Sequence, residues 1–181
     1  MELMIELERN SRSNNLSLKK DGKDIKLVVP RSKMPFGFKV NNYGANDQIN
    51  LMISLSDNPA FADEYRTLER EIIQELSNRY EDLFNTKMSV DEIYNVFNSN
   101  ISDSDTLRIK YTEDSRLYDS NRVPSTMTII DGCCANYTVT CNFYISGIYF
   151  MNKKIGLVLK AHHVKIFEPE NQGFMFLDRD D

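Results

Sequence analysis

Five side chains of metal-ligand type lie in the last third of the sequence: Cys133, Cys134, Cys141, His162 and His163. Structural zinc sites usually space their ligands two to four residues apart, whereas Cys133 and Cys134 are adjacent. His162 and His163 are predicted to point to opposite faces of a strand, so at most one of them can join a site. Cys141 falls on the apolar phase of its strand, where a free thiol behaves as a small hydrophobic side chain. The sequence therefore favours free thiols in a reducing compartment, with a zinc protein or metal-dependent nuclease as an alternative.

A recognisable catalytic arrangement is absent from the sequence. There is no Gly-x-Ser-x-Gly nucleophile elbow, the two histidines are adjacent, and the seven glycines are scattered rather than gathered in a phosphate-binding loop. Several carboxylates do cluster, but on the polar face of a predicted helix, where a solvated surface is the ordinary interpretation: Glu69, Glu71, Glu75, Glu81 and Asp82. We therefore expect a binding protein without enzymatic activity.

Basic and aromatic residues interleave in two segments of a chain whose net charge is −5. Residues 16–40 hold seven Lys or Arg against two Asp, and residues 106–167 hold eight basic against four acidic residues. Single-stranded nucleic acid is held by aromatic faces that stack on bases and by cations that follow the phosphates. The candidates for such contacts are Lys19, Lys20, Lys23, Lys26, Arg31, Lys33, Phe36, Phe38, Lys39, Tyr43, Arg108, Lys110, Tyr111, Arg116, Tyr118, Arg122, Tyr144, Tyr149, Lys153 and Lys154. Any of these aromatic residues can instead fill the core, but Tyr144 stands out because it lies on the polar phase of its strand.

The acidic residues are concentrated elsewhere. Residues 57–105 hold twelve acidic against four basic residues, and the last fourteen residues hold five acidic residues against Arg179 alone. Large apolar side chains accompany the terminal acids, and the residues predicted to bind a partner are Phe174, Phe176, Leu177, Asp178, Asp180 and Asp181. An acidic segment can occupy a basic groove in place of nucleic acid, and exposed Phe and Leu can anchor a partner protein. A frayed chain end is the alternative.

Alternation of apolar and polar residues predicts strands at residues 16–20, 24–29, 48–56, 107–111, 126–130, 137–150 and 155–167. Asp21-Gly22 favours a tight hairpin turn between the first two, after which Pro30 and Pro35 break the pattern. Asn152-Lys153-Lys154 supplies the turn of the last hairpin. The phase of the apolar residues changes at His162-His163, which predicts a β-bulge.

Helical spacing replaces this alternation in the first acidic block. Asn58 can cap a helix with Pro59 at its first position, and apolar residues then recur every three or four residues from Phe61 to Leu83. Ser89 and Glu92 have the spacing of a capping box that opens a shorter helix, with Val90, Ile93, Tyr94 and Phe97 on its inner face. We expect one helical insertion, at about 58–98, in a domain of residues 1–167 that is followed by the tail of residues 168–181.

No apolar run is long enough to span a bilayer. The segment from Met1 to Arg12 carries Glu2, Glu6 and Glu8, which is not typical of a signal peptide. The expected location is the cytosol or nucleus.

A series of short motifs resembles the single-stranded DNA-binding proteins of large nucleocytoplasmic DNA viruses, which are similar in plan to phage replication proteins with an OB-fold. In chain order these motifs are Val29-Pro30; Pro35-Phe36-Gly37; the strand Ile49 to Leu55; Asp82-Leu83-Phe84 followed by Met88-Ser89-Val90-Asp91-Glu92-Ile93; Leu107 to Tyr111; and Gly147-Ile148-Tyr149-Phe150 before Lys154 to Ala161. They cover most of residues 27–167. The family favours Trp in the helical insertion and in the closing hairpin, where this chain, which has no Trp, carries Phe84, Tyr149 and Leu159.

The resemblance implies a fold that is mostly β with a helical insertion (α+β): an OB-fold-like β-barrel with two inserted helices and a flexible C-terminal tail. It further implies sequence-nonspecific binding of single-stranded DNA during viral DNA replication, recombination or repair, in the host cytoplasm or nucleus and without a cofactor. The tail is similar to those of replicative single-strand binders, which implies recruitment of replication proteins and a homo-oligomer such as a dimer. The alternative is a protein-interaction or structural module without nucleic-acid affinity, and RNA remains open as a ligand beside DNA.

Overall fold

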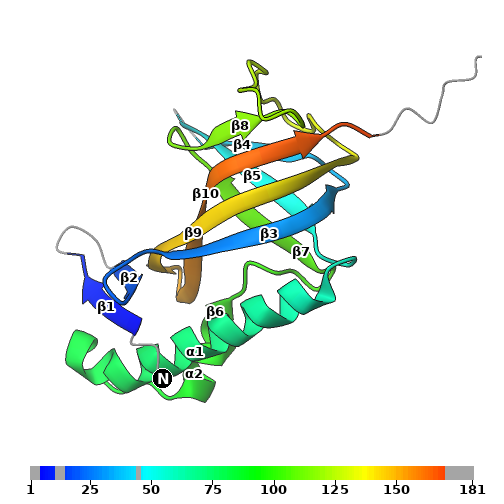
Figure 1. The fold of residues 1–181 in the computed structure, drawn as a ribbon. Helices are drawn as coiled ribbons and strands as arrows, with labels where there is room; N and C mark the ends of the chain where they lie inside the picture. The colour runs from blue at the N-terminus through cyan, green and yellow to red at the C-terminus, as the bar shows by residue number, and fades with distance from the viewer. Residues whose placement is uncertain (1–4, 11–14, 44–45, 170–181) are drawn as a thin grey trace, which may run out of the picture.

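The computed structural model describes residues 5–10, 15–43 and 46–169, and it is built mainly of strands with two helices (Figure 1). The elements are β1 (Ile5–Arg9), β2 (Leu16–Lys20), β3 (Ile25–Met34), β4 (Phe38–Tyr43), β5 (Asn46–Ser54), α1 (Pro59–Phe84), α2 (Val90–Val96), β6 (Phe97–Asn98), β7 (Thr106–Tyr111), β8 (Arg116–Tyr118), β9 (Tyr137–Met151) and β10 (Lys154–Phe167). The mostly β class with a helical insertion is confirmed. The predicted partner-binding residues of the tail, from Phe174 to Asp181, lie outside the described residues.

Five of the strands close into a barrel. β3 pairs with β9, β9 with β10, β10 with β7, β7 with β5, and β5 pairs again with β3. The pair of β7 and β10 is parallel and the other four pairs are antiparallel. Two of the seams are short, since β3 meets β5 at Lys33 and Ser54, and β7 meets β10 at Lys110 and Lys160. This is the partly open five-stranded barrel of the OB type, so the expected fold is confirmed.

The barrel interior is filled by the apolar phase of each strand. On β9 the buried side chains are Val139, Cys141, Phe143 and Ile145, and they alternate with more exposed ones. β5 and β7 contribute further buried residues, among them Leu51, Ile53, Leu107 and Ile109. Cys141 therefore acts as the small hydrophobic residue predicted for its position. Because successive side chains of a strand point to opposite faces, burial of this set leaves the intervening polar residues on the outside of the barrel.

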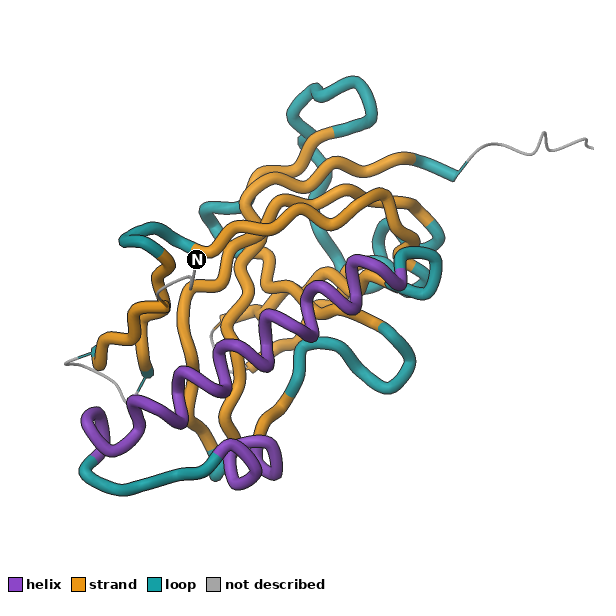
Figure 2. Tube along the Cα trace, turned by 60° about the horizontal axis from the view of Figure 1, so that its bottom comes forward, coloured by secondary structure: helices purple, strands orange, loops and turns teal. Residues whose placement is uncertain are grey.

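Helix α1 lies across one end of the barrel, below it in Figure 1 and in front of the strands in Figure 2, and buries the apolar side that includes Phe61, Tyr65 and Ile72. The Tyr65 ring lies 6.4 Å from that of Phe143 on β9, so the helix closes this end of the core. Asn58 takes the N-cap position with Pro59 at the start of the helix, as predicted, but its side chain makes no capping hydrogen bond. Its amide nitrogen instead donates to the Arg31 carbonyl oxygen at 3.2 Å and to Ser32 Oγ at 2.7 Å, which fastens the start of the helix to β3.

The capping box of α2 is confirmed by two hydrogen bonds. Ser89 N–H donates to the Glu92 carboxylate at 2.7 Å, and Glu92 N–H donates to Ser89 Oγ at 3.2 Å. Ile93 is buried as expected, but Tyr94 is 43% exposed and does not belong to the inner face. The helix is only seven residues long, so its buried side is narrower than the spacing alone indicated.

A buried polar network joins α1 to the chain before β7. Ser99 Oγ donates to Glu69 Oε1 at 2.7 Å, and Tyr65 Oη donates to Asn100 Oδ1 at 3.1 Å. Asn100 Nδ2 in turn donates to the Leu157 carbonyl oxygen of β10 at 3.3 Å. Burial raises the pKa of Glu69, although the hydrogen bond from Ser99 and the charge of Arg66 act in the opposite direction. Glu69 is therefore the exception among the carboxylates that were predicted to be solvated.

The strands before the barrel pair differently from the prediction. The turn at Asp21-Gly22 is confirmed: both residues have positive φ, and Lys20 and Lys23 exchange backbone hydrogen bonds of 2.8 and 3.0 Å. Beyond this turn the two strands separate, because β2 pairs with β1 and with the middle of β9, whereas β3 pairs with β9 and β5. β1 was not predicted.

Three further expectations concern strand limits. β3 continues through Pro30, and the break predicted there is a register shift between Val29 and Ser32. The strand predicted at residues 126–130 is wrong, since this segment is a loop with Ile130 63% exposed. The bulge at His162-His163 is confirmed by a register shift between Ala161 and His163. No helix in the described part of the chain is long and apolar enough to cross a membrane.

Candidate nucleic-acid interface

Strand register assembles one line of polar side chains around the outside of the barrel. Across neighbouring strands Lys39 lies opposite Asn50, Asn50 opposite Lys110, and Lys110 opposite Lys160. The line continues because Lys160 lies opposite Tyr144, and Tyr144 opposite Lys26. We refer to these six residues, Lys39, Asn50, Lys110, Lys160, Tyr144 and Lys26, as the outer row. Neighbouring strands lie about 4.8 Å apart, so the row is a short and nearly continuous band with four lysines.

The centre of the row concentrates positive charge. Burial lowers the pKa of Lys110, and the charges of Lys160 and Arg108 lower it further. Lys110 and Lys160 face each other across the parallel seam of the barrel. An approaching anion offsets the repulsion between Lys110 and the charges of Lys160 and Arg108, so the centre of the row is suited to bind a phosphate group.

Tyr144 is the aromatic member of the row and is half-buried. Burial raises the pKa of its hydroxyl, and the negative charges of Asp114 and Asp24 raise it further. It stands between Lys26 and Lys160 on the outside of the barrel. In such an arrangement the aromatic ring can stack on a base while the two cations neutralise the neighbouring phosphates of the strand.

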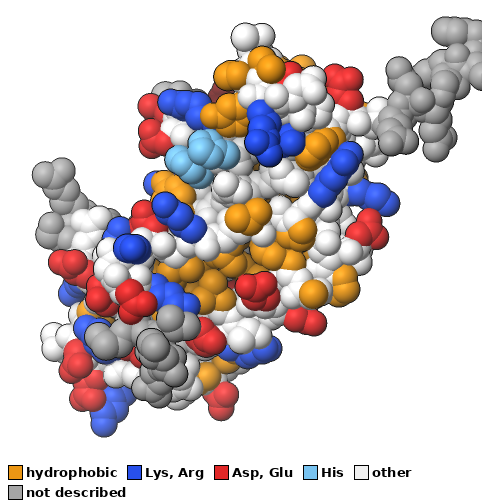
Figure 3. Space-filling model, in the orientation of Figure 1, with side chains coloured by type: hydrophobic (Ala, Val, Ile, Leu, Met, Phe, Trp, Pro, Cys, Tyr) orange, Lys and Arg blue, Asp and Glu red, His pale blue; other side chains and the backbone are white. Residues whose placement is uncertain are grey.

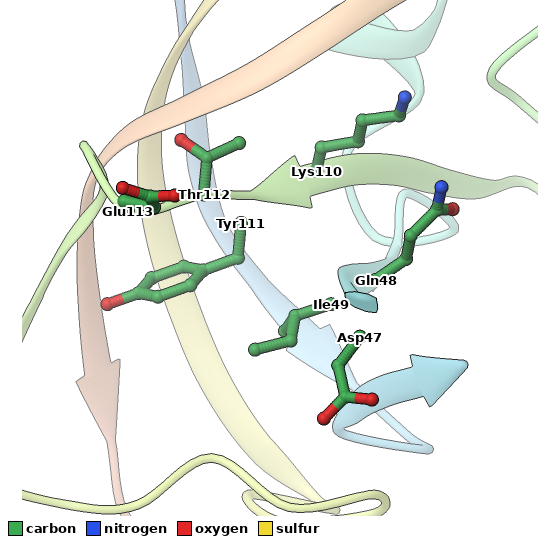
Figure 4. Close-up of a pocket in the computed structure, with 7 residues that line it drawn as sticks. All are labelled: Asp47, Gln48, Ile49, Lys110, Tyr111, Thr112 and Glu113. Atoms are coloured by element: carbon green, nitrogen blue, oxygen red, sulfur yellow. The ribbon is translucent and has the colours of Figure 1, made fainter. Parts of the chain in front are cut away.

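A hollow of about 480 Å³ opens beside the row where β5 and β7 lie side by side (Figure 4). The side chains of Lys110 and Tyr111 point to opposite sides of β7. The Tyr111 ring packs edge-on against the Phe38 ring, with 5.7 Å between the ring centres. Asp47 and Glu113 also line the hollow, so its charge is mixed. The positive charge available to a ligand here comes from the outer row rather than from the hollow itself.

A second hollow, of about 320 Å³, lies over β8, β9 and β10 and is lined by Tyr118, Arg122, Thr140, Asn142, His163 and Lys165. Figure 3 shows the two histidines beside several Lys and Arg side chains on this part of the surface. Three candidates from the sequence, Arg116, Tyr118 and Arg122, are gathered on or next to it.

Several other candidates are engaged within the protein. Lys19 forms an ion pair with Asp24 at 2.6 Å, and Lys33 forms one with Asp57 at 3.4 Å. The Arg31 side chain donates to Thr138 Oγ1 at 2.8 Å, and its guanidinium lies 3.9 Å from the centre of the Phe167 ring. These contacts leave the three basic residues at the surface, but part of their charge is already partnered.

The aromatic candidates divide between core and surface. Phe38 is fully buried, so its assignment to the binding surface is corrected to a core position. The Tyr149 hydroxyl accepts a hydrogen bond from Asn98 at 3.1 Å and its ring covers Gly156, which gives it a structural role. Phe36 is 74% exposed in the turn before β4 and remains available for contacts. The structure does not describe the side chain of Tyr43.

The remaining basic candidates lie at two turns. Lys20 and Lys23 flank the turn between β2 and β3. Lys153 and Lys154 lie at the turn between β9 and β10, where they line a hollow of about 370 Å³ with residues that include Tyr80 of α1. None of these four lysines belongs to the outer row, because each lies at a turn rather than on the strand positions that form the row.

The cysteines and histidines do not meet. Cys133 and Cys134 lie in the loop before β9, whereas Cys141 is in the barrel core. Burial raises the pKa of the Cys134 and Cys141 thiols to about 12 each. The prediction that His162 and His163 point to opposite faces is wrong: the bulge leaves both exposed, with ring centres 4.0 Å apart. Within the described residues, no group of three or more His, Cys, Asp or Glu side chains is arranged to hold a metal ion.

Two members of the outer row were missed by sequence reasoning, Asn50 and Lys160. Lys160 was recognisable, because it lies between the apolar residues Leu159 and Ala161 in a basic segment and so belongs to the outer face of its strand. Asn50 carries no charge and is buried beside the lysines, so nothing in its own residue type pointed to the site. Lys165 of the second hollow was also missed.

Comparison with solved structures finds similar folds among phage proteins. The single-stranded DNA binding protein gp2.5 encoded by bacteriophage T7 matches with a TM-score of 0.51 and 14% sequence identity, covering 83% of this chain and 90% of that one. A single-stranded DNA-binding protein from bacteriophage Enc34, solved in complex with single-stranded DNA, matches with a TM-score of 0.48 and 9% identity, covering 93% and 97% of the two chains. No family model and no curated protein matches the sequence. At these identities the likeness to gp2.5 concerns the fold.

Proposed function

We propose that this protein binds single-stranded DNA without sequence preference, and that the outer row follows the strand around the barrel. The observation that carries the proposal is the register that brings Lys26, Lys39, Lys110 and Lys160, widely separated in sequence, into one line with Tyr144. The fold shared with gp2.5, which is named as a single-stranded DNA binding protein, supports the same class of ligand.

The shape of the row favours a single strand over a duplex. Its members lie on the five barrel strands and on β4, which pairs with β5, so the line that they form is curved. Duplex DNA has a persistence length of about 150 base pairs and would touch such a convex surface at few points. A single strand bends from one nucleotide to the next and can follow the whole row.

The chemistry of the row accounts for the lack of sequence preference. A lysine ammonium group binds any phosphate, and a tyrosine ring stacks on any base. Each phosphate contact with a single strand contributes about −0.7 to the slope of log K against log salt concentration, so the four lysines predict a slope of about −3.

The test is a titration of fluorescently labelled oligo-dT with the full chain, followed by anisotropy at several salt concentrations. We expect binding at low salt that weakens steeply as salt is added, and weaker binding of a duplex of equal length. An RNA oligonucleotide of the same length in the same series determines the preference between the two nucleic acids. Absence of oligo-dT binding at low salt would contradict the proposal and favour a protein-interaction module.

The biological setting that we infer is viral DNA replication, recombination or repair in the host cytoplasm or nucleus, where exposed single strands need protection. No chemical step is assigned to the protein. This setting rests on the resemblance of the sequence motifs to the viral family and extends beyond the fold itself.

The acidic tail is assigned a regulatory role within the same proposal. Residues 168–181 carry five acidic residues and one arginine, a charge opposite to that of the outer row. A tail of this charge competes with DNA for the row and, once displaced, is free to recruit replication proteins or a second copy of the chain. A chain that ends at Phe167 is expected to bind oligo-dT more tightly than the full chain. Equal or weaker binding would reject the competition, and light scattering on both chains measures the oligomeric state.

A further inference from the structure

The hollow over β8, β9 and β10 has the composition of a nucleotide site. Its side chains come from Tyr118, Arg122, Thr140, Asn142, His163 and Lys165, all of which are neutral or cationic. The volume of about 320 Å³ is open to the surface and at the small end of the range for ligand sites. A hollow with cations, an amide and aromatic rings, but without a carboxylate among its lining residues, favours an anionic aromatic ligand.

The rings of Tyr118 and His163 in this hollow and the ring of His162 beside it form a series. The His162 and His163 rings lie 4.0 Å apart and are inclined by 35°. The Tyr118 ring meets His163 edge-on, with 5.6 Å between ring centres. The series exists because the bulge after Ala161 turns two consecutive residues of β10 to the exposed side.

The hollow is continuous with the outer row. His163 lies opposite Asn142 on β9, and Asn142 is two residues from Tyr144 in the same outward phase. Two residues of a strand span about 7 Å, so a chain of nucleotides that stacks on Tyr144 reaches the hollow without leaving the surface. Val28 lies opposite Asn142 on the other side and is 60% exposed, which keeps the approach open.

We propose that this hollow is a second nucleotide-binding station for the same strand, and that His163, whose ring lies beside that of His162, takes up a proton when a phosphate enters it. This inference rests on the proposed function and adds a pH dependence to it. Tyr118 supplies a stacking face, Arg122 and Lys165 supply fixed positive charge, and His163 supplies a positive charge that is present only with the ligand or at low pH.

The surroundings of the histidines determine the direction of the effect. Burial, His162 and Arg116 lower the pKa of His163 from its ordinary value of 6.5, so the free protein holds this ring neutral near neutral pH. The ionisable groups that face the ring are Arg116 and Tyr118 from β8, Arg122 from the following loop, and His162 and Lys165 from β10; β9 contributes Thr140 and Asn142. A bound phosphate offsets the repulsion between the cations and raises the His163 pKa. Protons are therefore taken up on binding, and affinity rises as the pH falls.

The experiment compares oligo-dT binding by the full chain at about pH 6 and about pH 8, where a histidine of ordinary pKa changes its charge. Because the chain has only two histidines, the variant H162N/H163N is free of histidine. We expect wild-type affinity to be about fivefold higher at the lower pH, given that uptake of one proton changes affinity by at most about tenfold per pH unit. The histidine-free variant is expected to lose most of this ratio.

A second variant and a second readout separate the station from a general effect of pH. Tyr118→Leu is expected to weaken binding about tenfold at both pH values, because it removes a stacking face but no proton. In proton NMR the His163 signal is expected to titrate at a higher pH when oligo-dT is present. An unchanged pH ratio in the histidine-free variant, or a His163 titration that is the same with and without the oligonucleotide, would overturn this inference. Wild-type binding that is absent at both pH values would instead overturn the proposed function.

Discussion

Replacement of both Lys110 and Lys160 by alanine removes the centre of the outer row. The two residues face each other across the parallel seam and are two of its four lysines. With a contribution of about 0.7 per phosphate contact, the slope of log K against log salt is expected to change from about −3 to about −1.5. If the two proteins bind equally at about 1 M salt, each lost contact reduces affinity by a factor near eight at about 50 mM salt, so the double variant should bind oligo-dT roughly sixtyfold more weakly.

The matched control removes two positive charges from the helical insertion. Arg70 is exposed on α1, and Lys87, in the segment between α1 and α2, has an 83% exposed side chain. The variant R70A/K87A therefore makes the same change in net charge as K110A/K160A at a distance from the row. Anisotropy titrations over a salt series give both slopes, and thermal unfolding verifies that each variant is folded. Equal losses in the two variants would refute the reasoning, since only total charge would then matter.

Three further substitutions test separate parts of the account. Tyr144→Leu is expected to weaken oligo-dT binding about tenfold without lowering the melting temperature, and unchanged affinity in the titration would remove Tyr144 from the interface. Glu69→Gln tests the buried carboxyl group. The pKa of Glu69 in the folded state lies above its ordinary value of 4.5, so the folded state keeps a proton that the unfolded state releases. The free energy of unfolding of the wild type therefore increases as the pH falls from neutral towards 4.5. The variant should be more stable than wild type at neutral pH and less dependent on pH in urea unfolding; an identical pH dependence would contradict this. Gly37→Ala is expected to lower the free energy of unfolding by at least about 2 kcal/mol, because Gly37 has a φ of 65° and an added Cβ would collide with the Cys133 carbonyl oxygen. A free energy of unfolding equal to that of the wild type in the same urea assay would refute this prediction.

Long periodic segments were predictable from the sequence. α1 and the hairpin of β9 and β10 follow from many repeats of a single spacing, and even the bulge at His162-His163 appears as a change of phase. The segment 126–130 has strand-forming residues but pairs with no strand, so its local preference is not realised. β1 was missed because its pattern, Ile5 and Leu7 between charged residues, is too short to stand out.

Four of the six residues of the outer row were predictable one by one, but their arrangement was not. Lys26 and Lys110 were recognised as basic residues on predicted strands, and Lys39 as a basic residue between two of them. Their alignment depends on pairings between strands far apart in the chain. Register of this kind arises from tertiary packing and leaves no local signal. The same limitation explains Phe38, whose burial results from the position of β4 against β5 rather than from its own neighbours in sequence.

The most direct test of the central claim is the location of bound oligo-dT on the protein. At 21.0 kDa the chain suits amide NMR, in which chemical shifts are followed during titration with the oligonucleotide. The account predicts changes along the outer row, at Asn50, Lys110, Tyr144 and Lys160, with the exposed side of α1 unaffected. Changes confined to the helices, or no changes at low salt, would contradict it.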